Sequence, residues 1–250
     1  MLDFQECISK ARRTSGGSQP LARRTLRNIK ASIMQFVHYA VANGYMEPLR
    51  GQLYIPAAAP NTERVILQPA DISRLFSGPS SADWYINVFR FALVTGLRTG
   101  EVLGIQSGDI KNNVLYVQRS INCRNQITEG KNENARRCIY LNKIARQIIN
   151  ENQFRNGRLC TPWIFCSKTG APLSQSTLRN AWLKLAKERN LPGCPYSLRH
   201  TFISLLKNEM PEAMLKHIVG HSSSMQTIGG VYDHLVDGEM ESAAKIIDIN

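Results

Sequence analysis

The chain has 250 residues, of which 31 are Lys or Arg and 19 are Asp or Glu, so its formal net charge is +12. With 43% hydrophobic residues it can bury a sizeable core, which excludes global disorder. Its apolar runs are far shorter than the roughly 18 residues that cross a bilayer, and its start lacks the plan of a signal peptide. We therefore expect a cytoplasmic protein with no membrane partner, whose basic surface meets a polyanion.

The positive charge is concentrated in two stretches. Residues 1–50 carry a net charge of +5 and residues 111–160 a net charge of +7, whereas residues 51–110 and 161–250 carry −1 and +1. Each basic stretch is a candidate surface for nucleic acid. A charged face that only keeps the protein in solution is the alternative.

The cysteines predict no covalent framework. Six of them are scattered along the chain, and none forms a Cys-x-x-Cys pair. Without a secretion signal, this pattern favours reduced and mostly buried thiols over disulfides or a zinc site.

The first basic stretch predicts helices. A short helix is expected over residues 2–13, and a longer one over residues 21–43, where apolar side chains recur at steps of three and four. Arg23, Arg27 and Lys30 follow the same spacing on another face, which suits contact with a phosphate backbone.

These helices define the first of two predicted domains. We interpret residues 1–60 as a small helical domain with a candidate nucleic-acid surface, and the proline-rich residues 48–60 as its linker. A second domain is expected over residues 65–250.

The second domain is predicted to be mostly helical. Its helices are expected to start at Pro69 and to cover residues 84–94, 143–154, 176–190, 198–209 and 211–219. Residues 113–119, 123–128 and 137–141 tend to alternate and predict one small sheet. The predicted fold class is therefore mainly α with a small antiparallel β-sheet, an α+β protein.

Four short motifs follow one another in this domain. Arg98 stands at a Gly-flanked junction between two helices, and Arg199 stands in Tyr-Ser-Leu-Arg-His near a helix start. His221 follows a Val-Gly pair, and Tyr232 follows Gly-Gly-Val. Taken alone, Arg98 would be a salt-bridge partner of Glu101.

The order Arg, His-x-x-Arg, Leu-Gly-His and Tyr resembles the tyrosine recombinase, or phage integrase, family. The resemblance runs from about residue 68 to the end, and weakly through residues 21–60. It implies a helical core-binding domain, here shorter than usual in the family, followed by a catalytic domain with a C-terminal tail helix. It also implies cleavage and rejoining of DNA through a 3′-phosphotyrosine, with no metal, ATP or other cofactor.

The family's catalytic lysine lies in a pattern like Lys-Thr-x-x-Ser-x-Arg-x-Ile-x-Leu. Lys131 begins the matching stretch here, and the second arginine, the isoleucine and the leucine are in register. Asn132 and Ala135 replace the threonine and serine.

The resemblance assigns a role to each residue. Arg98 and Arg199 would clamp the phosphate with His221 as a third donor, since arginine forks bind anionic oxygens in pairs. Tyr232 would be the nucleophile and Lys131 the general acid.

Three further residues belong to the predicted site. Glu101 and His200 would support the clamp. Tyr196 stands where the family usually has histidine; its hydroxyl can still donate a hydrogen bond. His217, His221 and His234 are not expected to bind metal, because no acid lies between the first two.

The partners follow from the same resemblance. We expect double-stranded DNA and a homotetramer on paired sites, with no small-molecule substrate. Residues 240–247 suit a tail helix that docks on a neighbouring protomer or folds back on its own domain.

Several functions stay open. The favoured one is a site-specific recombinase or integrase of a mobile element. A type IB topoisomerase would share the chemistry but relax DNA without site choice, and a catalytically impaired DNA-binding regulator is suggested by Tyr196. An RNA-binding protein explains the charge but not the motifs.

Overall fold

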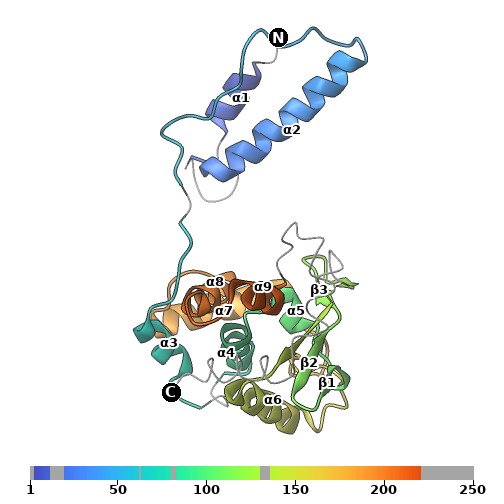
Figure 1. Cartoon of the computed structure of the whole chain (residues 1–250), viewed down its shortest axis with the longest axis vertical. Coiled ribbons are helices and arrows are strands. Elements are labelled where there is room, and N and C mark those ends of the chain that lie inside the picture. Colours follow the sequence, from blue (N-terminus) through green and yellow to red (C-terminus); the bar gives the residue numbers. More distant parts are fainter. Residues whose placement is uncertain (1–2, 12–19, 62, 80–82, 130–135, 221–250) are drawn as a thin grey trace. The chain divides into compact units, whose positions relative to one another are not determined.

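The computed structural model describes residues 3–11, 20–61, 63–79, 83–129 and 136–220 (Figure 1). The chain divides into two compact units, residues 1–64 and residues 65–250. Within the described part of the chain, no helix is both long enough and apolar enough to cross a membrane.

The first unit consists of two helices and a segment that folds back on them. Helix α1 (Phe4–Lys10) begins at Asp3, whose side chain accepts hydrogen bonds from two backbone N–H groups of the first turn. Helix α2 (Arg23–Ala42) ends shortly before Gly44, which adopts a φ of +72°. Both helices are shorter than predicted but fall within the predicted ranges.

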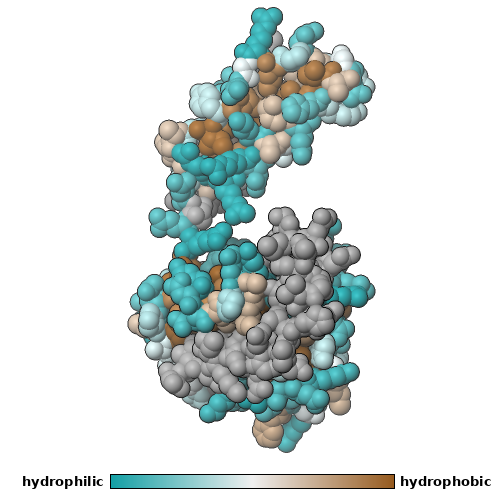
Figure 2. All heavy atoms as spheres, in the orientation of Figure 1, coloured by the Kyte–Doolittle hydropathy of each residue, from teal (hydrophilic) through white to brown (hydrophobic). Residues whose placement is uncertain are grey.

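Residues 48–60 are not a linker, contrary to the prediction. Leu53 and Ala59 are buried with Ile8 of α1 and Leu26 of α2. Gln5 also exchanges two hydrogen bonds with the backbone of Tyr54, at 3.1 and 2.8 Å. Two helices alone bury too little apolar surface, so this segment completes their core. Apolar side chains still show on this unit, as the brown atoms of Figure 2 indicate.

The second unit is built around a central buried helix. Every residue of α4 (Ile86–Thr95) is buried, and the helix packs mainly against α8 and α6 (Figure 1). Apart from Asn87, Arg90 and Thr95 its side chains are apolar, and a helix that is apolar on most sides belongs inside a core. The other helices are α3 (Pro69–Phe76), α5 (Thr99–Leu103), α6 (Lys143–Asn156), α7 (Gln175–Arg189), α8 (Pro195–Leu206) and α9 (Glu212–Val219).

The strands form two small antiparallel sheets rather than the single one predicted. One sheet has the order β1 (Ile110–Lys111), β2 (Val114–Val117) and β5 (Arg137–Tyr140), with Leu115 opposite Ile139. The other is a hairpin of β3 (Ser120–Ile121) and β4 (Ile127–Thr128). The fold class predicted from the sequence is confirmed.

The hairpin explains the error in strand assignment. Residues 123–126 form its turn, where the Asn122 side chain accepts hydrogen bonds from the backbone N–H groups of Arg124 and Gln126. Asn125 adopts a φ of +59°, which asparagine tolerates better than most residues. The alternating pattern that predicted a strand therefore belongs mostly to the turn of this hairpin.

The cysteines differ from the prediction in their exposure. All six are free thiols, but Cys166 alone is buried. Four are exposed: Cys7 on α1, Cys123 in the hairpin turn, Cys160 in a loop and Cys194 at the start of α8.

Candidate active site

The junction between α4 and α5 requires glycine and presents Arg98. Gly96 has a φ of +64°, and a Cβ atom there would lie 2.2 Å from the Phe202 ring. Beyond this turn, the Arg98 backbone N–H donates to Glu101 Oε2 at 2.9 Å, and Arg98 Nη1 donates to Glu101 Oε1 at 2.9 Å. The predicted salt bridge therefore exists, yet the Arg98 side chain stays 39% exposed.

The Glu101 carboxylate is shared with a second arginine, Arg137, at the start of β5. Arg137 Nη1 and Nη2 donate to the two carboxylate oxygens at 3.2 and 3.0 Å. Burial alone would raise the pKa of the Glu101 carboxyl, but the hydrogen bonds and charges of Arg137 and Arg98 outweigh it and hold that pKa below its ordinary value. Glu101 is thus an anion between two cations.

Arg199 is the most deeply buried cation of the site. Helix α8 begins with Pro195 in its first turn, three residues earlier than predicted, and carries Arg199 into the core with 1% exposure. Its Nη1 donates to the Gly96 carbonyl at 2.8 Å. Its Nε and Nη2 are buried and find no hydrogen-bond partner among the residues that the structure describes.

The charge on Arg199 is retained despite this burial. Burial, followed by the positive charge of Arg98, lowers the pKa of Arg199 to about 10. The guanidinium is therefore still protonated at neutral pH. Burying a cation with two unbonded donors costs free energy unless an anion binds those donors.

Tyr196 and His200 stand one helical turn apart on α8. Their rings meet edge to face, with centroids 4.8 Å apart, and the Tyr196 side chain is exposed. The residue that replaces the expected histidine is therefore packed against His200, with its ring accessible.

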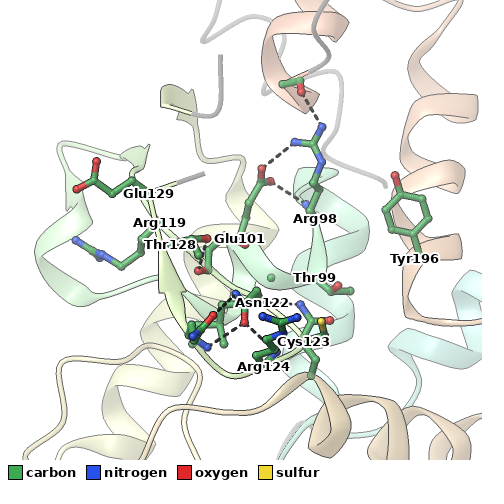
Figure 3. Close-up of a pocket in the computed structure, with 16 residues that line it drawn as sticks. Arg98, Thr99, Glu101, Arg119, Asn122, Cys123, Arg124, Thr128, Glu129 and Tyr196 are labelled. Carbon is green, nitrogen blue, oxygen red and sulfur yellow. Dashed lines mark hydrogen bonds and ion pairs between the residues drawn. The ribbon is translucent and has the colours of Figure 1, made fainter. Parts of the chain in front are cut away.

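A cavity of about 690 Å³ lies beside these residues; its lining includes Arg98, Glu101 and Tyr196 but not Arg137 or Arg199 (Figure 3). Arg98, Glu101 and Tyr196 line it on one side. The other side is lined by Arg119 and by the β3–β4 hairpin that follows it, with Asn122 and Arg124. The hairpin can approach because Gly100 has no side chain: a Cβ atom there would lie 2.7 Å from the Ile121 carbonyl oxygen. The cavity thus brings several cations to one opening.

The cavity also includes Gly220, the residue before His221. Arg98 Nη2 donates to the Gly220 carbonyl at 2.8 Å. His221 itself, Lys131, Tyr232 and the predicted tail helix at 240–247 lie outside the described residues, so their places in the site stay predictions.

The predicted cationic stripe of α2 is not uniform. Arg27 is exposed and Lys30 is half-buried. Arg23 instead donates from Nη2 to the Ala57 carbonyl at 2.7 Å, within its own unit. Among the described residues, no three His, Cys, Asp or Glu side chains gather as metal ligands would.

Sequence reasoning missed the part that Arg137 plays. In the sequence this residue only matches a position of the lysine pattern. Its contact with Glu101 spans 36 residues of sequence, and a local motif carries no sign of such a partner.

Comparison with known proteins adds a family and several relatives. The profile of the phage integrase family matches residues 66–239. The chain is 23% identical to a XerC-like tyrosine recombinase of Caldanaerobacter subterraneus, over 92% of this chain and 67% of that protein. It is 26% identical to the tyrosine recombinase XerH of Campylobacter jejuni, over 70% of this chain and only 50% of that protein.

Solved structures share the fold. The Tn1549 transposon integrase, in complex with a circular intermediate DNA, matches with a TM-score of 0.71 and 24% identity, over 84% of this chain and 75% of that one. A lambda integrase tetramer bound to a Holliday junction matches with a TM-score of 0.60 and 18% identity, over 81% and 60% of the two chains.

Proposed function

The chain belongs to the phage integrase family, and we propose that it is a site-specific DNA recombinase that cuts and rejoins double-stranded DNA through a 3′-phosphotyrosine. We further propose that it integrates or excises a mobile element, as a homotetramer on paired sites in the cytoplasm. The similar integrases bound to DNA, one of them a tetramer on a Holliday junction, support this proposal.

The observation that carries the proposal is the state of Arg199. Two of its buried nitrogens lack partners in the described part of the chain, and its positive charge persists beside that of Arg98. A phosphodiester offers the anionic oxygens that such a pair of guanidinium groups would bind in forked geometry. Charge that develops on these oxygens during attack on phosphorus would be stabilised most, which is the condition for catalysis.

The reaction is an exchange of esters. The Tyr232 phenolic oxygen forms a bond to phosphorus, and the bond from phosphorus to the 5′ oxygen of the next nucleotide breaks. The phenol loses its proton, and the leaving oxygen gains one. Because one phosphodiester replaces another, the reverse step rejoins DNA without ATP.

Two proton movements need assistance. The ordinary pKa of tyrosine is about 10, so cations near the Tyr232 oxygen would favour its ionised form. Lys131 would deliver a proton to the leaving oxygen as general acid. It lies in residues 130–135, which join the cavity residue Glu129 to the strand that begins with Arg137.

Binding and chemistry would use different cations. Arg27 and Lys30 of the first unit are proposed to contact phosphates. Arg124 of the hairpin turn lines the cavity and is a further candidate for such a contact. Arg23 is the weakest of the three α2 candidates, since it already binds a carbonyl.

A covalent trap tests the proposal even though the target sequence is unknown. Duplexes of random sequence are nicked next to each potential cleavage position, so that the short fragment released by cleavage diffuses away. We expect a protein–DNA adduct that survives denaturation, is enriched in one sequence and forms equally in EDTA. Tyr232→Phe, the matched control, is expected to bind the same DNA without forming the adduct.

Other results would favour the other functions. Adducts without sequence enrichment, together with relaxation of any plasmid, would indicate a topoisomerase. Enrichment of bound sequences without any adduct would indicate a DNA-binding regulator.

A further inference from the structure

We propose that Arg137 is a positioning residue of the recombination reaction: it neutralises Glu101 so that the charge of Arg98 stays available to the phosphate. This inference rests on the proposed function. It assigns to a residue outside the predicted catalytic set a defined effect on the phosphate clamp.

The contacts of Arg137 define its immediate partners. The side chain is 2% exposed, and all three of its guanidinium nitrogens donate hydrogen bonds. Nη1 and Nη2 bind the two oxygens of Glu101, and Nε binds the Ile218 carbonyl at 2.7 Å. Arg137 therefore links three elements, namely β5, α5 and the end of α9.

The charges around Glu101 explain why this link matters for chemistry. Arg98, Arg137 and Glu101 together carry a net charge of +1. If Arg137 were neutral, Arg98 and Glu101 would form a neutral pair, and the partly exposed guanidinium of Arg98 would attract a phosphate less strongly. Arg137 thus keeps one positive charge at the mouth of the cavity without touching the substrate.

The same side chain fixes the start of the C-terminal segment. Gly220 has a φ of +63°, and a Cβ atom there would lie 2.8 Å from Arg137 Nη1. The Gly220 carbonyl accepts the hydrogen bond from Arg98 Nη2. Arg137 and Arg98 therefore hold adjacent parts of the backbone that leads directly into His221.

The test compares cleavage with binding in variants of the full chain. Single-turnover cleavage is measured with a saturating amount of the nicked duplex recovered by the covalent trap. We expect Arg137→Met to cleave about 100-fold more slowly, the size of effect seen when one transition-state donor is lost. Its dissociation constant for the duplex is expected to change less than about threefold, because most phosphate contacts lie elsewhere.

Two further variants separate charge from folding. Arg90→Met is the matched control, because Arg90 is also buried but binds the carbonyls of Leu75, Ser77 and Gly78. It is expected to lower the melting temperature and leave the cleavage rate of the folded protein unchanged. Arg137→Lys keeps the charge without the fork, and we expect its rate within about tenfold of wild type.

A modified substrate distinguishes a defect in phosphate stabilisation from a defect in the general acid. A duplex with a bridging 5′ sulfur at the scissile position releases a thiolate, which leaves without a proton. With this substrate, the cleavage rate of Lys131→Ala is expected to return to near the wild-type rate, whereas that of Arg137→Met is expected to stay low.

Three results would overturn the inference. It fails if Arg137→Met cleaves at the wild-type rate, if the sulfur substrate restores it, or if folded Arg137→Lys is as slow as Arg137→Met. A wild-type protein that forms no adduct would instead refute the proposed function itself. The two failures are therefore distinguishable.

Discussion

Two buried arginines of the second unit contrast with an exposed arginine of the first. In the second unit, Arg137 and Arg199 are buried. All three guanidinium nitrogens of Arg137 donate hydrogen bonds, whereas two of those of Arg199 find no partner in the described part of the chain. In the first unit, Arg27 is exposed on a helix surface. A buried arginine with fixed geometry suits stabilisation of a reacting phosphate, whereas an exposed one suits contact with a duplex backbone. Net charge alone does not distinguish these two uses.

Substitution of Arg199, one of the two buried arginines, is expected to have the largest effect on the reaction. Arg199→Lys keeps a cation but loses the fork, so adduct formation is expected to fall about 1000-fold. The measurement is single-turnover cleavage of the nicked duplex. Arg90→Lys provides a matched buried control, and equal losses in the two variants would show that burial rather than phosphate binding explains Arg199.

Lys131 is expected to show the next largest effect. Lys131→Ala is expected to slow cleavage by about 100-fold or more, since general acids contribute on that scale. With the 5′-sulfur duplex its rate is expected to return to near the wild-type rate. If the variant stays slow on that substrate, another residue supplies the proton.

The first unit provides the complementary prediction. Arg27→Ala is expected to weaken binding severalfold and to reduce the slope of log affinity against log salt by about 0.9. The cleavage rate at saturating DNA is expected to stay the same. Arg23→Ala is its neighbouring control, and its expected effect is a lower melting temperature with an unchanged salt slope, because Arg23 binds the Ala57 carbonyl. A wild-type salt slope for Arg27→Ala, or a slower cleavage rate at saturating DNA, would contradict the assignment of Arg27 to DNA binding alone.

Among the residues of the candidate active site, the smallest effect is expected at Tyr196. Tyr196→Phe removes the hydroxyl but keeps the ring contact with His200, so we expect a loss of about tenfold or less in cleavage rate. The folded protein's affinity for DNA provides the control. A loss as large as that of Arg199→Lys would place Tyr196 in the phosphate clamp.

The sequence was sufficient to predict the family, the fold class and the enzyme class, and all three predictions are confirmed. Motif order also singled out Arg98 and Glu101, which line one cavity, and Arg199, which binds the glycine turn that leads to Arg98; the roles assigned to them stay predictions. Local signals were enough there, because each of these residues stands next to a glycine turn or a helix start.

Features that depend on distant contacts were missed. The proposed role of Arg137 rests on its contact with Glu101 of another element, and the packing of Leu53 and Ala59 follows from how little core two helices can form. The turn at residues 123–126 has alternating polarity, which a strand would also show. In each case the deciding interaction lies outside the local pattern.

The most direct test of the central claim is to map the covalent link between protein and DNA. The trapped adduct is digested with trypsin and nuclease, and the modified peptide is identified by mass spectrometry. We predict a nucleotide joined through its 3′ phosphate to Tyr232, formed by the wild type and reduced about 1000-fold in Arg199→Lys. A link to another residue, or tight DNA binding with no link at all, would contradict the account.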